Sequence, residues 1–343
     1  IPNAYIFALA IHNGVIYAGS NSGLFISNDN GNTWLYVGIT KSSISTITGK
    51  GQYLFVGTWG GGTFRSNNNG DSWSSTNSLN PYISSLAIYE ENLYEATVPV
   101  VSHRNWRIYI STGGGVNIST NQGQNWKKTT LASNWINKLY INAERIYVIS
   151  HFDTLYVTTD GGEVWKRTGL SNEISYLSLA NDGQYLYAGS PGGFYASTNY
   201  GEQWTKTGLE DVSVNALAIK DQYIYAGTDL GVFVSKDHGK NWTMSDLVVK
   251  TRNLLFHGEY VYAATYADIY FSNTNGLNWT KIGTMKSNIS ALAISNNTLF
   301  AATYNDDLWK LDLNSLTSVE EQTNADNNFD LMLSPNPNNG MLH

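Results

Sequence analysis

The chain has 343 residues and a net charge of −7, with 42% hydrophobic, 13% aromatic and 14% charged residues and 32 glycines. This composition can bury a large core and supply many turns, which indicates an all-β globular protein and not a disordered chain. The acidic balance, without a basic run, argues against nucleic acid as a partner. No apolar stretch approaches the ~20 residues of a transmembrane helix, and the lack of cysteine excludes disulfides and thiol catalysis.

Seven octapeptides share one pattern, with Ser or Thr first, Gly fifth and Trp last. They begin, in chain order, at Ser27, Ser66, Ser119, Thr158, Ser197, Ser235 and Ser272. Their tryptophans are separated by 39, 53, 39, 39, 38 and 37 residues, a near-constant period that indicates one repeated supersecondary unit. Gly tolerates positive φ in a tight turn between strands, and the third side chain can accept hydrogen bonds from backbone N–H groups. We call these segments octapeptide turns 1 to 7.

The octapeptide turns resemble the Asp-box, or bacterial neuraminidase repeat, and the resemblance covers nearly the whole chain apart from its tail. That family occurs in β-propellers, so the resemblance implies this fold. The family's aspartate is present as Asp29, Asp160 and Asp237 and is replaced by Asn68, Asn121, Asn199 and Thr274. Because four of the seven turns lack the carboxylate, we interpret the turn as a folding device and not as a metal or catalytic site. Asp-boxes also accompany unrelated activities, so the fold does not assign the function.

Each period contains three short apolar strands and a fourth strand at the Trp, which we call A, B, C and D. Strand A recurs eight times, at residues 8–11, 45–48, 85–88, 138–141, 176–179, 216–219, 253–256 and 291–294. The last unit continues through 299–303 and 308–311 but has no octapeptide turn. We therefore expect a single β-propeller of four-stranded antiparallel blades, with eight blades favoured and seven as the alternative. The missing strand would come from residues before Ala8 or from 315–319.

After Leu313 the periodicity stops and the composition becomes polar, so we divide the chain into a propeller, 1–313, and a linker with a tail, 314–343. The run 334–340, Ser-Pro-Asn-Pro-Asn-Asn-Gly, resembles the start of the C-terminal sorting domain of the type IX secretion pathway. This resemblance implies a protein exported to the medium or to the outer surface of a bacterium. The chain also resembles the Asp-box assembly factors of photosystem II, which have the same fold, but the sorting-like tail argues against membership of that class.

Function is expected in the loops, because propeller strands mainly pack blade against blade. The A–B turns and octapeptide turns are uniform and share one face, whereas the B–C and D–A connections share the other face and vary. An insertion of about 14 residues near 98–112 and three tryptophans outside the repeat pattern fall on the variable face. Aromatic rings there can stack on sugars or anchor a protein interface, or merely cap the blades. The candidate ligand-binding residues are Trp59, His103, Arg104, Trp106, Arg107, Trp135, His151, Phe152, Tyr266 and Tyr304.

Two charged residues occupy strand positions that are apolar in other units. Glu95 aligns with Ala18 and Ala226, and Arg65 with apolar residues of other C strands. A buried charge needs a partner, so we predict an ion pair between Arg65 and Glu95 on adjacent blades. The alternative is that Glu95 lines a pocket beneath the insertion.

We predict a monomeric, secreted or cell-surface, non-catalytic propeller that binds a polysaccharide or an extracellular protein without a cofactor. The histidines show no metal-ligand spacing. With six arginines and no N-terminal Arg-Ile-Pro motif, the chain does not match a sialidase. A glycoside hydrolase remains the alternative, because a suitably spaced carboxylate pair could exist on the variable face. Its candidates are Asp153, Asp229, Asp268, Asp306 and Asp307.

Overall fold

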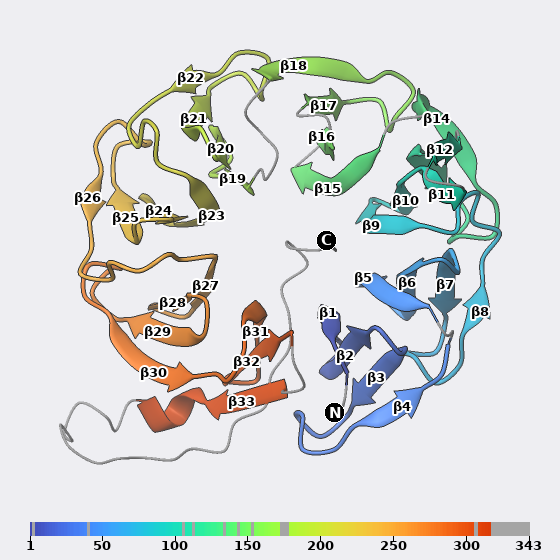
Figure 1. The fold of residues 1–343 in the computed structure, drawn as a ribbon, viewed down its shortest axis with the longest axis horizontal. Coiled ribbons are helices and arrows are strands. Elements are labelled where there is room, and N and C mark those ends of the chain that lie inside the picture. Colours follow the sequence, from blue (N-terminus) through green and yellow to red (C-terminus); the bar gives the residue numbers. More distant parts are fainter. Residues whose placement is uncertain are drawn as a thin grey trace.

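The computed structural model describes residues 1, 4–39, 42–104, 107–111, 114–132, 135–142, 145–151, 154–171, 178–304 and 308–316. Eight blades surround a common axis (Figure 1), which confirms the predicted propeller and its eight-blade form. Within each blade the strand order follows the chain and neighbouring strands are antiparallel, with the A strand nearest the axis. None of the described segments is a helix long and apolar enough to cross a bilayer.

The first four blades include blade 3, which carries the insertion. Blade 1 comprises β1 (Ile6–His12), β2 (Val15–Ser20), β3 (Leu24–Ser27) and β4 (Leu35–Val37). Blade 2 comprises β5 (Ser43–Lys50), β6 (Tyr53–Trp59), β7 (Thr63–Ser66) and β8 (Ser74–Ser75). Blade 3 comprises β9 (Ile83–Tyr89), β10 (Asn92–Thr97), β13 (Gly115–Ser119) and β14 (Lys127–Ala132), with the inserted hairpin β11 (Val100–Arg104) and β12 (Arg107–Ser111). Blade 4 comprises β15 (Ile136–Asn142), β16 (Arg145–Ser150), β17 (Thr154–Thr158) and β18 (Lys166–Ser171).

The last four blades are regular except for the final one, in which the described residues form three strands. Blade 5 comprises β19 (Ser178–Asn181), β20 (Leu186–Ser190), β21 (Gly193–Ser197) and β22 (Thr205–Lys206). Blade 6 comprises β23 (Val214–Lys220), β24 (Tyr223–Thr228), β25 (Val232–Ser235) and β26 (Thr243–Met244). Blade 7 comprises β27 (Asn253–His257), β28 (Tyr260–Ala264), β29 (Asp268–Ser272) and β30 (Thr280–Thr284). Blade 8 comprises β31 (Ile289–Ser295), β32 (Thr298–Thr303) and β33 (Leu308–Asp312).

The core lies between blades. Every B strand carries one aromatic residue with at most 2% of its surface exposed: Tyr17, Phe55, Tyr94, Tyr147, Tyr187, Tyr225, Tyr262 and Phe300. Apolar clusters join residues of neighbouring blades, as where Leu24 and Ile26 of blade 1 pack with Ile44 and Leu54 of blade 2. Each blade therefore completes its core only against the next blade, and burial of this apolar area drives the array together.

Each octapeptide turn is held by its own side chains. In turn 1, Ser27 Oγ donates to Asp29 Oδ1 at 2.8 Å and accepts from Gly31 N at 2.8 Å, while Thr33 N donates to Asp29 Oδ1 at 2.8 Å. Hydrogen bonds hold the pKa of Asp29 at about 2. Turn 7 uses Thr274 in place of aspartate, and its hydroxyl accepts from Asn278 N at 2.9 Å. The turn therefore needs an acceptor at its third position but not a charge.

The turns also bind the preceding blade. The Tyr17 hydroxyl of blade 1 donates to Asn69 O in turn 2 at 2.7 Å, and the Tyr147 hydroxyl of blade 4 donates to Tyr200 O in turn 5 at 3.0 Å. The fourth turn residue that presents this carbonyl has positive φ, +54° at Asn69 and +60° at Tyr200. The left-handed geometry thus serves contact between blades as well as reversal of the chain.

The same contact closes the ring. Turn 1 lies on blade 8, where Asn30 Nδ2 donates to Thr298 Oγ1 at 2.7 Å and Gly31 packs against Phe300. Among the described residues, no fourth strand pairs with β33. The described residues before Ala8 do not supply it, because Ile6 begins β1. Residues 313–316 form a 3₁₀ turn, and residues 317–343, with the predicted tail, lie outside the described residues.

The turn glycines offer a test of this contact. Gly276 has φ of +73°, and an added Cβ would lie 2.5 Å from Tyr225 Cε1 of the preceding blade. Gly258 also has positive φ, +57°, but a Cβ there would meet no atom within 4 Å. We expect Gly258→Ala to lower the free energy of unfolding by about 1 kcal/mol, and Gly276→Ala by a further ~1–3 kcal/mol from overpacking. Urea unfolding measures both, and equal losses would contradict the contact.

Candidate binding face

The two faces of the disc differ as predicted. On the A–B face, neighbouring blades interlock through polar contacts: Asn13 Nδ2 donates to Gly51 O at 3.0 Å and to Asn69 Oδ1 at 3.0 Å. Lys50 pairs with Glu91 of the next blade at 2.9 Å. Because these side chains serve contact between blades, a ligand site is expected on the opposite face, which the B–C and D–A connections form.

On blades 2 and 3 this face carries a packed aromatic pair. Trp59, at the end of β6, meets Tyr82, just before β9, edge to face with centroids 5.8 Å apart. A backbone bridge joins the same two residues, and Gly60 N donates to Pro81 O at 2.8 Å. Both rings are half-buried. Trp59 therefore fastens blade 2 to blade 3 and leaves only part of its ring for a ligand.

On blade 4, Trp135 and His151 form a second pair. Their rings stack with centroids 4.4 Å apart and planes at 17°, and His151 N donates to Trp135 O at 2.8 Å. His151 is exposed. The structure thus brings together two predicted site residues that are 16 positions apart in the sequence.

The insertion forms a separate antiparallel hairpin on blade 3 (Figure 1), in which Arg104 pairs with Arg107. His103 and Arg104 lie on β11 and Arg107 on β12. Trp106, Phe152, Asp153, Asp306 and Asp307 lie outside the described residues, so their part in the site stays a prediction.

A third cluster lies across the ring, on blades 6 to 8. Tyr266 is 53% exposed, and the Arg252 guanidinium lies 4.9 Å from its ring centroid. Tyr304 of blade 8 is half-buried; burial raises its pKa, and the nearby Arg252 charge opposes that shift. Two predicted site residues are therefore linked by an arginine that the sequence reasoning did not single out.

Sequence reasoning also missed an apolar patch beside this cluster, formed by Leu230, Val248 and Val249. Their exposed fractions are 52%, 62% and 45%. Leu230 and Val248 belong to adjoining loops, because a Cβ on Gly231 would lie 3.1 Å from Val248 Cα. Two consecutive valines in a D–A connection were the available sequence signal. The signal was ambiguous, because a buried strand gives the same run of apolar residues.

Two of the candidate carboxylates on this face, Asp229 and Asp268, each pair with a lysine. Asp229 receives Lys250 Nζ at 2.7 Å and Asn215 Nδ2 at 2.9 Å. Burial acts to raise the pKa of Asp229, but these two donors and Arg252 hold it below its usual value. Asp268 receives Lys281 Nζ at 2.7 Å. Asp229 therefore lacks the raised pKa that a glycosidase acid requires.

Glu95 does not pair with Arg65, so the predicted ion pair is wrong. The Glu95 side chain is fully buried and accepts from Thr63 Oγ1 and Ser78 Oγ of blade 2 and from Asn117 Nδ2 of blade 3, each at 2.9 Å. Burial raises the pKa of Glu95 above its usual value. The single proton of the Ser78 hydroxyl can go to Glu95 Oε2 or to Asn80 O, which lies at 2.8 Å. When Glu95 is protonated, Glu95 donates to Ser78 Oγ and the Ser78 proton goes to Asn80 O. Because burial favours the neutral form, we expect Glu95 to be a neutral tie between blades. It has no exposed surface with which to line an open pocket.

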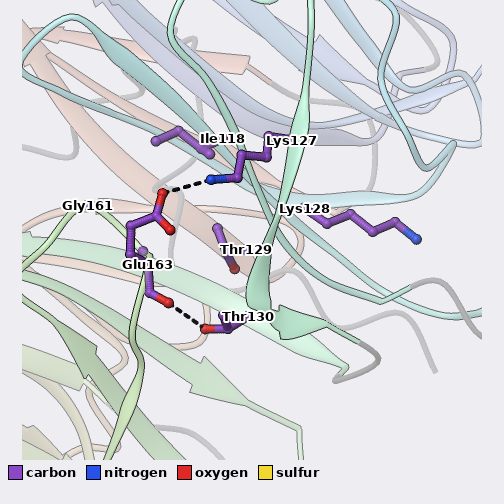
Figure 2. Close-up of a pocket in the computed structure, with 8 residues that line it drawn as sticks. Ile118, Lys127, Lys128, Thr129, Thr130, Gly161 and Glu163 are labelled. Atoms are coloured by element: carbon purple, nitrogen blue, oxygen red, sulfur yellow. Dashed lines mark hydrogen bonds and ion pairs between the residues drawn. The ribbon is translucent and has the colours of Figure 1, made fainter.

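Arg65 instead reaches the outer rim, where its Nη1 donates to Gln122 O of turn 3 at 3.3 Å. It lines a hollow of about 170 Å³ between β8 and turn 3. The equivalent hollow between β14 and turn 4, about 120 Å³, is drawn in Figure 2, where Lys127 pairs with Glu163 at 2.8 Å. Both hollows are smaller than typical ligand sites of roughly 300–1,000 Å³. Among the described residues, no group of three His, Asp or Glu could hold a metal.

Comparison with solved structures agrees with this architecture. No protein-family model matches the chain, and no curated protein matches it. The computationally designed Ika8 protein gives a TM-score of 0.70 at 14% identity, over 88% of this chain and 94% of that chain. YCF48 bound to D1 peptide gives 0.57 at 15%, over 76% and 90%. The extracellular domain of BT4673 from B. thetaiotaomicron gives 0.55 at 15%, over 88% of this chain and 50% of that chain. At such identities the likeness establishes the propeller fold alone.

The state of Glu95 can be tested by pH. Because its folded pKa is raised, the folded chain holds a proton that the unfolded chain lacks between the two pKa values, and the free energy of unfolding falls as pH rises through that window. Glu95→Gln removes this titration, so the variant should gain stability relative to the parent as pH rises above the usual glutamate pKa of about 4. Chemical denaturation across this range measures the gain, with exposed Glu210→Gln as control. If the parent instead gains stability relative to Glu95→Gln as pH rises, the neutral tie is contradicted.

Proposed function

We propose that this chain is an extracellular, non-catalytic binding propeller whose B–C and D–A face holds a protein partner. The observation that carries the proposal is the apolar patch of Leu230, Val248 and Val249 beside the Arg252–Tyr266 pair. Exposed apolar side chains next to arginine and tyrosine are typical of protein interfaces, because they form large contacts from which water is excluded.

A protein partner fits the geometry better than a polysaccharide. Sugar platforms need an aromatic ring with an open face, but Trp135 is stacked on His151 and Trp59 is packed on Tyr82. YCF48, which has the same fold, is bound to D1 peptide in its structure, and this likeness supports a polypeptide ligand here by analogy.

The non-catalytic and extracellular parts of the proposal have separate support. The non-catalytic role is supported by Asp229 and Asp268, the two described candidates for acid and nucleophile, because each is held by a lysine. The extracellular location is supported by the tail that resembles a sorting domain and by the BT4673 neighbour, which is an extracellular domain. Membership of the Asp-box family is supported by the seven turns and their hydrogen bonds.

A parallel screen of the full chain tests the proposal: a phage-displayed random peptide library and a glycan array, with hydrolysis of each retained glycan measured. We expect peptide binders that compete with one another for the face. Val248→Asp and Tyr266→Ala should each weaken the selected peptides about tenfold, as loss of an interface anchor does. Fluorescence anisotropy measures the affinities.

Val164→Asp is the matched control, because Val164 is 56% exposed but lies in octapeptide turn 4 on the opposite face. It should leave peptide affinity unchanged. Retention of a glycan without cleavage, lost on Trp59→Ala, together with no peptide binders, would contradict the protein partner and assign a polysaccharide. Cleavage of a glycan that is abolished by a single aspartate change would contradict the non-catalytic role.

A further inference from the structure

Blade 8 differs from the others at its outer edge. In blades 1 to 7 a fourth strand pairs with the third, but β33 pairs with β32 alone among the described residues. An unpaired edge presents backbone donors and acceptors to any extended chain that reaches it. The edge lies at the rim of the disc (Figure 1).

The hydrogen-bond pattern shows which backbone groups face outward. Leu313 N donates to Asn297 O at 2.8 Å. Since bonded pairs alternate in an antiparallel ladder, Leu311 and Trp309 bond to β32, and the N–H and C=O of Lys310 point to the open edge. Phe271 occupies the position in the third strand of blade 7 that Lys310 occupies in blade 8. Phe271 pairs with Thr280 of β30, the fourth strand of blade 7.

The other blades indicate the side chain that such a strand needs. Trp309 occupies the position in the third strand of blade 8 that Phe25 occupies in the third strand of blade 1. In blade 1, Tyr36 of β4 covers the Phe25 ring, with ring centroids 5.1 Å apart. In five further blades the fourth-strand residue at this place is long: Lys128, Arg167, Lys206, Met244 and Lys281. Long aliphatic stems cover an aromatic ring while their charged ends stay in water. The half-buried Trp309 has no such cover from a fourth strand among the described residues.

We propose that the outer edge of β33 is a strand-addition site, which takes an extended basic segment of another protein as the fourth strand of blade 8. The segment lies antiparallel to β33, with a lysine, arginine or tyrosine opposite Trp309. The net charge of −7 favours a basic segment. The site is independent of the function proposed above.

Two other occupants fit this chemistry less well. Residues 317–343 of the same chain are acidic and contain no lysine, arginine or tyrosine, so that Met332 and Met341 are their only counterparts to the long side chains named above. Pairing of two β33 edges from two copies would set Trp309 or Leu311 opposite Trp309, in place of the long side chains that the other blades use. Both occupants are outcomes of the test below.

The probe is a fluorescent peptide with the sequence of residues 278–284, Asn-Trp-Thr-Lys-Ile-Gly-Thr, which contains the fourth strand of blade 7. In the register of that blade, its Thr280 would face Lys310 and its Lys281 would face Trp309. Binding to the full chain is measured by anisotropy. N-methylation at the position of Thr280 removes the donor to the edge and should weaken binding about tenfold. N-methylation at Lys281, whose N–H faces away, is the matched control and should change little. Equal effects of the two methyl groups would overturn the proposal.

Two substitutions in the chain complete the test. Lys310→Pro removes the outward N–H without breaking a bond to β32, which an edge strand tolerates, and should abolish peptide binding. Lys310→Ala keeps the N–H and should retain binding. If Lys310→Pro does not fold by circular dichroism, the two methylated peptides decide alone. Unchanged binding by folded Lys310→Pro would overturn the proposal. So would a dimer in sedimentation that Lys310→Pro dissociates, or binding that begins only after Met332→Pro, which would assign the edge to the tail.

Discussion

The architecture depends on one repeated contact, in which an octapeptide turn of one blade covers the buried B-strand aromatic of the blade before it. Tyr17 beneath Asn69 and Tyr147 beneath Tyr200 show the polar form, and Phe300 beneath Gly31 shows the apolar form that closes the ring. A blade cannot bury this aromatic alone, so cores form only between neighbours, as in other repeat arrays. Two constraints require glycine in the turn: its positive φ and the aromatic ring that packs against it.

Periodic features could be predicted from the sequence because each appears several times. The seven turns, the four-stranded unit and the division into a uniform and a variable face all follow from spacing, and the eight A strands favoured the correct blade number. Thr274 shows why letter patterns understate the turn: a hydroxyl accepts the same hydrogen bond as a carboxylate. Blade 8 could not be completed from the sequence, since no repeat specifies what pairs with β33.

Single features were harder to predict, because they depend on side-chain direction across blades. Arg65 and Glu95 lie on adjacent blades, yet Arg65 points to turn 3 whereas Glu95 points to Thr63 and Ser78. The spare tryptophans Trp59 and Trp135 do lie on the variable face, but each is packed on a neighbour. The apolar patch was hidden because Val248 and Val249 read as strand residues. Because one face is committed to contacts between blades, we propose that partners bind to the opposite face and to the outer edge of β33.

Closure of the ring is the claim on which this account depends most directly, and native-state hydrogen exchange on Phe300→Ala tests it. Phe300 belongs to blade 8 but packs with turn 1, more than 260 residues away in the chain. If turn 1 closes the disc on Phe300, amide protection should fall together in β32 and in β2 and β3 of blade 1, while blade 5 keeps its protection. Loss of protection confined to blade 8, with blade 1 unchanged, would contradict a closed ring held by these contacts.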